Sequence, residues 1–166
     1  MALEDFQRRL IELLPRLRRL ARALTPQSAD ADDLVQVALE RGLARRGQWL
    51  PGSRLDAWMF TIMKNAWIDE TRVRARQLRQ SAPAEAAERV ADPWVPSLEL
   101  RLEGQAVRRA IGRLPEDQRL AVALVLVEGL SYAEAAEVMA VPMGTLTSRL
   151  GRGRAALMAE LAGVAA

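Results

Sequence analysis

The stretch "GLSYAEAAEVMAVPMGTLTSRLGRGRAAL", residues 129–157, decides how this chain folds. Ser131 followed by Glu134 forms the pattern of a capping box, which predicts the start of a short helix that ends near Met139. Ala140 and Val141 then provide a tight turn, and Pro142 opens a second helix. A short helix, a tight turn and a second helix are typical of a helix-turn-helix, although a helical hairpin in a bundle has the same outline.

The second helix has two chemically different faces when its residues are placed at about 100° intervals. The inner face is apolar and close-packed, with Leu146, Leu150, Gly153 and Leu157. The outer face and its flanks are small, hydroxylated and cationic, as expected of a helix that presses against phosphates and base edges. The candidate DNA-contacting residues on this helix are Thr147, Ser148, Arg149, Gly151, Arg152 and Arg154.

Composition excludes several classes of function. The 166 residues contain no Cys and no His, which removes thiol chemistry, imidazole bases and the usual zinc sites. We therefore expect no catalytic residues, no metal and no cofactor. The first residues do not form a signal peptide, and no apolar run reaches the roughly 20 residues that span a bilayer. These features favour a cytoplasmic protein without membrane insertion.

The rest of the chain is dominated by helical patterns, so the predicted fold is all-α. Apolar spacing predicts a helix over 3–24, broken or kinked at Pro15. A second helix is predicted from an Asp30 cap to about Arg46, and a long third helix from a Ser53–Asp56 capping box to about Gln80. The run "LAVALVLV", 120–127, could be a buried strand, but the Pro-led start before it and Gly129 after it favour a helix.

The segment 81–97 differs in composition from the helices on either side. It contains three prolines, small residues and acids, which is typical of a flexible tether. The net charge of +3 is also uneven, because residues 1–80 contain 15 basic and 10 acidic side chains. The predicted organisation is two small helical domains, 1–80 and 104–166, joined by 81–103, which include the start of the next helix.

The long third helix carries a basic stripe toward its C-terminal end. Arg72, Arg76 and Arg79 extend a line that begins at Lys64, which is typical either of a phosphate-tracking surface or of an ordinary solvated face. Asn65 and Asp69 share a face one turn apart, and an Asn side chain can pair with a base edge.

Three motifs in order resemble the extracytoplasmic-function (ECF) class of bacterial RNA polymerase sigma factors, of the sigma-70 superfamily. "LPEDQR" and "VEGLSYAEAAEVMAVPMGTLTSRLGRGRAAL" are similar to the family's C-terminal promoter-binding domain. "DADDLVQVALERGLA" resembles its polymerase-gripping helix, and "PGSRLDAWMFTIMKNAWIDETRVRAR" its −10-reading helix. "LLPRLRRLARALT" resembles the general-stress subgroup of alphaproteobacteria. Thr147, Gly151 and Gly153 depart from the family pattern, which bears on affinity for the −35 element.

The resemblance implies a non-enzymatic transcription factor that directs core RNA polymerase to promoters in a stress response. It implies a region 2-like domain that binds polymerase and the −10 element, and a region 4-like helix-turn-helix that binds the −35 element. Its partners are core RNA polymerase, promoter DNA and an anti-sigma factor. By resemblance, the −10 contacts are Lys64, Asn65, Asp69, Arg72 and Arg76. The polymerase-binding residues are Asp32, Asp33, Leu34, Gln36 and Leu39.

Three alternatives remain open from the residues alone. The first is a sigma-like decoy that sequesters an anti-sigma factor without binding DNA. The second is an ordinary helix-turn-helix repressor, and the third is an enzyme with a carboxylate-bound metal. Transcription with purified core polymerase distinguishes among them.

Overall fold

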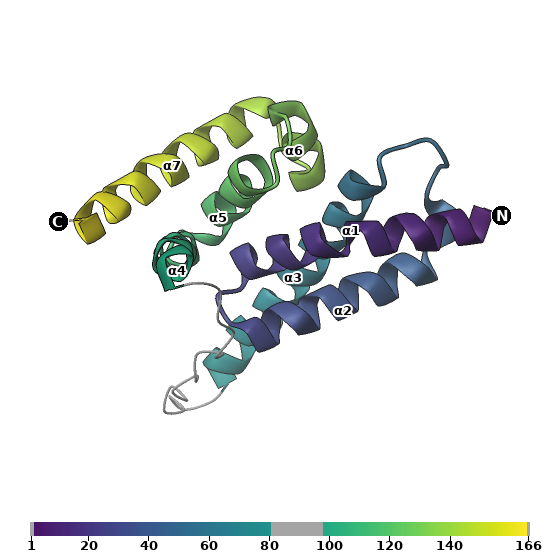
Figure 1. The fold of residues 1–166 in the computed structure, drawn as a ribbon, viewed down its shortest axis with the longest axis horizontal. Helices are drawn as coiled ribbons and strands as arrows, with labels where there is room; N and C mark the ends of the chain where they lie inside the picture. The colour runs from purple at the N-terminus through teal and green to yellow at the C-terminus, as the bar shows by residue number, and fades with distance from the viewer. Residues whose placement is uncertain (1, 81–97, 166) are drawn as a thin grey trace.

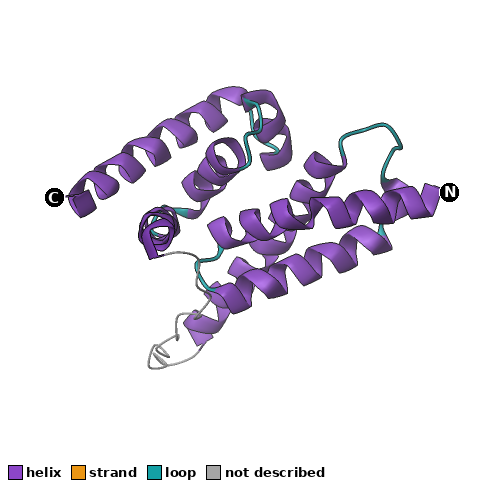
Figure 2. Ribbon diagram, viewed as in Figure 1, coloured by secondary structure: helices purple, strands orange, loops and turns teal. Residues whose placement is uncertain are grey.

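The computed structural model describes residues 2–80 and 98–165, and every regular element within these ranges is a helix (Figures 1 and 2). The all-α prediction is therefore confirmed for this part of the chain. The predicted tether at 81–97 lies outside the described residues. The elements are α1 (Ala2–Leu24), α2 (Ser28–Ala44), the 3-10 turn η1 (Arg46–Gln48), α3 (Leu55–Gln80), α4 (Leu98–Gly112), α5 (Glu116–Val122), the π-helical turn η2 (Ala123–Val127), α6 (Tyr132–Met139) and α7 (Met143–Ala165).

The N-terminal half consists of α1, α2 and α3, which pack around one another (Figure 1). Leu17 and Leu20 of α1, Leu34 of α2 and Met59 and Phe60 of α3 are almost fully buried between these helices. Of the predicted break or kink at Pro15, the break is wrong, because α1 continues as one helix through this residue. Pro15 lies on the exposed side of α1, where water can satisfy the backbone carbonyl that loses its hydrogen-bond donor.

Two predicted helix starts also differ from the structure. Helix α2 begins at Ser28, so Asp30 lies in its first turn and stabilises the helix N-terminus by charge instead of capping it. The Ser53–Asp56 capping box is absent, because Ser53 Oγ donates a hydrogen bond to the carbonyl of Leu50 (2.6 Å). Helix α3 starts at Leu55, and Asp56 accepts a hydrogen bond from the amide of Ala57 (2.8 Å).

The C-terminal half consists of α4 to α7, with α5 between α7 and the N-terminal half (Figure 1). The segment 120–127 is helical, as its flanks predict, and its buried residues supply much of the local core. Its second half widens into the π turn, in which the amide of Glu128 donates to the carbonyl of Ala123 (3.0 Å). Gly129, with φ +71, then ends the helical run in the left-handed conformation that glycine adopts easily.

The two halves pack against each other and share one continuous apolar core. Arg119 of α5 donates to the carbonyl of Leu24 at the end of α1 (3.0 Å), and also to the carbonyls of Gly112 (2.7 Å) and Leu114 (3.0 Å). Pro26 lies against Gly112, at the end of α4. The patterns in the sequence did not predict this contact between the halves.

Candidate nucleic-acid interface

Helices α6 and α7 form the predicted helix-turn-helix. The amide of Glu134 donates to Ser131 Oγ (3.1 Å), and the amide of Ser131 donates to the carboxylate of Glu134 (3.4 Å), so both halves of the capping box are present. The turn passes through Ala140, whose φ of 56° places a non-glycine residue in the left-handed region. Helix α7 follows at Met143 and continues to Ala165.

The outer face of α7 is open, as predicted. Thr147, Ser148, Gly151, Arg152 and Arg154 are all exposed. A Cβ atom built on Gly151 has no heavy atom within 4 Å, so only solvent lies beside this glycine. The face combines hydroxyls and guanidinium groups with little side-chain bulk, which allows close approach to phosphates and base edges.

Two side chains of this face have partners within the protein. Thr147 Oγ1 donates to the carbonyl of Met143 (2.8 Å), which leaves its methyl group and oxygen lone pairs at the surface. Arg149 is half-buried and lies 3.4 Å from the carboxylate of Asp117. For Arg149 to contact DNA, it would have to give up its ion pair with Asp117 at the edge of this face.

The inner face of α7 shows why Gly153 is small. Leu146 and Leu150 are buried, and a Cβ atom built on Gly153 lies 2.8 Å from Val122 Cγ2. The predicted close helix crossing is therefore present between α5 and α7. Gly151 and Gly153 both lower the helix propensity of α7, but Gly151 faces solvent whereas Gly153 faces the packed helix α5.

The −10 candidates on α3 divide into exposed and buried positions. Asn65, Asp69, Arg72 and Arg76 are exposed, and Asp69 also forms a 3.0 Å ion pair with Arg41 of α2. Lys64 is only 7% exposed, and burial lowers the pKa of its ammonium group. Lys64 lies on the inner side of α3, so a direct contact between Lys64 and DNA does not fit this arrangement.

Most of the polymerase-binding candidates on α2 form a polar edge at the surface of the helix. Asp32, Asp33 and Gln36 are exposed and Leu39 is half-buried. Leu34 is only 1% exposed, because its side of α2 faces the core, so its predicted role as a surface contact is corrected to a packing role. Next to this edge, α1 and α2 enclose an apolar groove of about 270 Å³. Its lining residues are Gln7, Leu10, Ile11, Leu14, Leu39 and Leu43.

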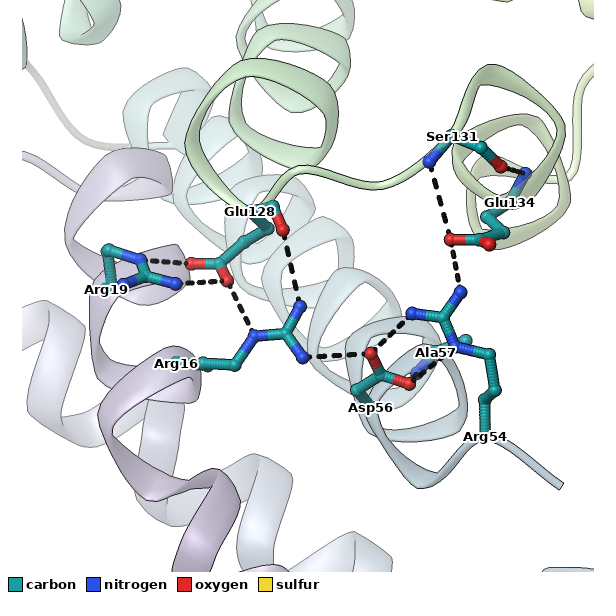
Figure 3. Close-up of polar contacts among 8 residues, drawn as sticks. All are labelled: Arg16, Arg19, Arg54, Asp56, Ala57, Glu128, Ser131 and Glu134. Carbon is teal, nitrogen blue, oxygen red and sulfur yellow. Dashed lines mark hydrogen bonds and ion pairs between the residues drawn. The ribbon is translucent and has the colours of Figure 1, made fainter. Parts of the chain in front are cut away.

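A cluster of charged residues between the two halves was not predicted (Figure 3). The carboxylate of Glu128 accepts hydrogen bonds from Arg16 Nε (3.2 Å) and from Arg19 Nε and Nη2 (2.8 and 2.9 Å). Hydrogen bonds to Glu128 raise the pKa of Arg19, against the lowering effect of burial. A signal existed in the sequence, since Glu128 is a lone acid at the end of an apolar run, but its partners lie far away along the chain.

Comparisons with known proteins agree with this geometry. Residues 104–157 match the family described as sigma-70, region 4, and residues 10–64 match the sigma2 domain of PhyR. The chain is 37% identical over 152 residues to ECF RNA polymerase sigma factor EcfG of Rhodopseudomonas palustris, covering 92% of this chain and 82% of that protein. It is also 37% identical over 141 residues to ECF RNA polymerase sigma factor SigM of Mycobacterium tuberculosis, covering 85% of this chain and 69% of that protein.

Solved structures of sigma factors also resemble this chain. The sigma factor RpoE in complex with the anti-sigma factor NepR from Bartonella quintana superposes with a TM-score of 0.78 at 33% identity, covering 95% of this chain and 97% of that one. CnrH in complex with the cytosolic domain of CnrY gives a TM-score of 0.71 at 25% identity, covering 97% of this chain and 90% of that one.

The fold and its exposed helix-turn-helix define a protein of the sigma-70 type. The chain belongs to the ECF RNA polymerase sigma factors. Among residues 2–80 and 98–165, no cluster of acidic side chains is arranged to hold a metal ion. Within the same ranges, no helix is long and apolar enough to cross a bilayer.

Proposed function

We propose that this chain is an alternative sigma factor that directs core RNA polymerase to specific promoters in the cytoplasm. The observation that carries this proposal is the open outer face of α7, which presents Arg152 and Arg154 beside small and hydroxylated residues. The face is held on a rigid support, since the opposite side of α7 packs closely on α5. The sigma factor supplies promoter recognition, and the polymerase supplies catalysis.

The N-terminal half is proposed to bind the polymerase and the −10 element. The polar edge of Asp32, Asp33 and Gln36, together with Leu39, would dock on the polymerase largest subunit. The adjacent groove between α1 and α2 offers apolar surface for the same contact. On α3, Asn65 would contact a base while Arg72 and Arg76 follow the phosphates.

An anti-sigma protein is the proposed third partner. The two solved structures that resemble this chain contain the anti-sigma factor NepR and the cytosolic domain of CnrY. In this chain, α1 and α4 border a groove of about 710 Å³, open to solvent and lined by apolar side chains and arginines. Arg18, Arg19 and Arg108 contribute positive charge to it, which suits an acidic helix.

Transcription in vitro with purified core polymerase tests the proposal. The wild-type chain should give promoter-dependent transcripts, and Arg152→Ala should weaken promoter binding and flatten its salt dependence if Arg152 contacts a phosphate. Gly151→Glu should reduce binding without loss of folding, because the glutamate enters open space but brings negative charge against DNA.

Arg113→Ala is the matched control, because it removes an arginine that pairs with Glu160 on the other side of α7. Normal promoter binding by both Arg152→Ala and Gly151→Glu would show that this helix does not contact DNA. A chain that binds an anti-sigma protein but supports no transcription would favour the decoy alternative.

A further inference from the structure

The first two turns of α7 present two apolar groups at the surface. Met143 is 49% exposed, although methionine is among the residues that are most often buried. Thr147 follows one turn later on the same side of the helix and is also exposed. In a helix-turn-helix, the N-terminal residues of the second helix are the ones that reach base edges. These two side chains therefore lie where α7 would contact bases.

The hydroxyl group of Thr147 has no proton left to donate to a base. Its Oγ1 donates to the carbonyl of Met143 (2.8 Å), and a hydroxyl carries a single proton. This hydrogen bond also fixes the rotation of the side chain about χ1, so the methyl group is held in one orientation. Met143 ends in a methyl group beside a thioether sulfur, which is only a weak acceptor. At these two positions the helix presents carbon atoms and no hydrogen-bond donor.

The two exposed arginines of this face lie on its flanks. At about 100° per residue, Arg152 and Arg154 point about 160° apart around the axis of α7, and Thr147 and Gly151 lie between them. The major groove is about 12 Å wide and has phosphates on both walls, so one arginine on each flank suits contacts to both walls. The bases on the floor of the groove are then left to the groups between the arginines.

Two glycines allow the middle of this face to approach the bases closely. A Cβ atom built on Gly144 or on Gly151 has no heavy atom within 4 Å, so no other part of the protein stands in front of the helix there. The methyl group of Thr147 is on a short side chain, and it reaches a base only when the helix backbone comes near. The glycines remove the side chains that would hold the backbone away.

Thymine is the base whose chemistry matches this surface. In the major groove every base pair presents hydrogen-bonding groups, but the A·T pair adds an apolar group, the C5-methyl of thymine. Apolar side chains and the methyl group of threonine contact this C5-methyl. Guanine is read by a bidentate donor such as arginine, and the middle of this face holds Thr147 and Gly151 instead.

We propose that α7 reads thymine in the −35 element through the methyl groups of Met143 and Thr147, while Arg152 and Arg154 contact phosphates. The inference rests on the proposed function, and it goes further by naming the base and the two residues that select it. It requires at least one A·T pair in the −35 element, with its thymine methyl group against the first two turns of α7.

Replacing thymine by deoxyuridine in the DNA tests the contact, because the two bases differ only in the C5-methyl group. The probe is a promoter duplex on which the wild-type holoenzyme gives transcripts, with deoxyuridine at every thymine of the −35 element in both strands. The affinity of the holoenzyme should fall by about fourfold or more, which is the factor expected for one buried methyl group. The same number of deoxyuridines in the spacer between the two elements is the control and should leave the affinity unchanged.

Two variants test the residues. Thr147→Ser removes the methyl group and keeps the hydroxyl, and Met143→Ala removes the thioether. Each variant should bind the thymine duplex about threefold more weakly than the wild type. Each should also lose less affinity than the wild type when thymine is replaced by deoxyuridine, because part of the contact is already absent.

Met158→Ala is the matched control variant. Met158 is 64% exposed on the same helix, but it lies about 22 Å farther along the axis than Met143, which is more than the width of the major groove. Met158→Ala should therefore keep the full preference of the wild type for thymine over deoxyuridine. Circular dichroism verifies folding, and Thr147→Ser keeps the test decisive if Met143→Ala does not fold, since it changes one exposed methyl group.

The outcomes separate this inference from the proposed function. Equal affinity of the wild-type holoenzyme for the two duplexes would overturn thymine reading, whereas promoter binding and the proposed function would stand. A preference for thymine that folded Thr147→Ser and Met143→Ala both retain undiminished would also overturn it, because other residues or the stiffness of the duplex would then cause the preference. Absence of transcripts from the wild type on any promoter would refute the proposed function, and this inference with it.

Discussion

Alanine should stabilise the protein at one of two nearby glycines of α7 and should give no stabilisation at the other. Alanine is favoured over glycine inside a helix by about 1 kcal/mol. At Gly151 the new methyl group meets nothing within 4 Å, so Gly151→Ala should raise the free energy of unfolding by about that amount.

At Gly153 the same methyl group meets the packed α5 helix. Its position is 2.8 Å from Val122 Cγ2 and 3.3 Å from the backbone oxygen of Gln118. Val122 is fully buried and stiff at χ1, so it cannot move aside cheaply. Overpacking typically costs about 1–3 kcal/mol, so Gly153→Ala should be neutral or destabilised by up to about 2 kcal/mol despite its better helix propensity.

Urea unfolding followed by circular dichroism measures both free energies. The two variants should differ by about 1–3 kcal/mol, equivalent to a difference of a few degrees or more in Tm for a chain of this size. Adding Val122→Ala to Gly153→Ala should give a loss smaller than the sum of the two single losses, because the methyl groups that collide are then absent. Equal stabilisation by Gly151→Ala and Gly153→Ala would refute the close crossing.

Three further predictions concern other parts of the molecule. Asp33→Ala combined with Leu39→Ala should weaken binding to core polymerase in a pull-down assay while circular dichroism remains normal, and undiminished binding would remove α2 as the docking helix. Ala140→Gly should raise the free energy of unfolding by about 1 kcal/mol, because an L-residue at φ 56° is strained, and a lower urea midpoint would contradict this. Burial acts to raise the pKa of Asp56, but hydrogen bonds from Arg54 and Arg16 outweigh it and hold this pKa below its usual value. Its ion pairs therefore stabilise the fold above its unfolded pKa of about 3.9 and lose that contribution as pH falls toward the folded value. The difference in urea midpoint between wild type and Asp56→Asn should therefore be larger at pH 6 than at about pH 3, and a constant difference would exclude this role.

Local patterns were sufficient to predict much of the fold. The Ser131–Glu134 capping box, the turn before Pro142 and the two faces of α7 all depend on residues close together in the chain. The Pro-led start before residues 120–127 and Gly129 after them correctly predicted that this segment is helical. The sequence did not show that α1 continues past Pro15, because this depends on which side of the helix faces solvent.

The parts that could not be predicted depend on contacts between distant residues. Leu34 and Lys64 carry the right chemistry for their expected roles, but the packing of α1, α2 and α3 buries both. Glu128 and Arg16 are separated by most of the chain, and no periodic pattern relates them. The exposed residues on α7 could be predicted, because the pattern of apolar residues within this one helix indicates which of its faces is buried.

The π turn at Ala123–Val127 contains one residue more than a regular helical turn, so the position of Glu128 depends on the number of residues in this segment. Converting it to a regular α-helix would require one residue fewer, and each residue rotates an α-helix by about 100°. A deletion there would turn Glu128 away from Arg16 and Arg19 and would change the direction in which the chain leaves toward α6. In an alignment of relatives, a one-residue gap within 123–127 should therefore coincide with loss of the acid at 128, even where the helix-turn-helix itself is unchanged.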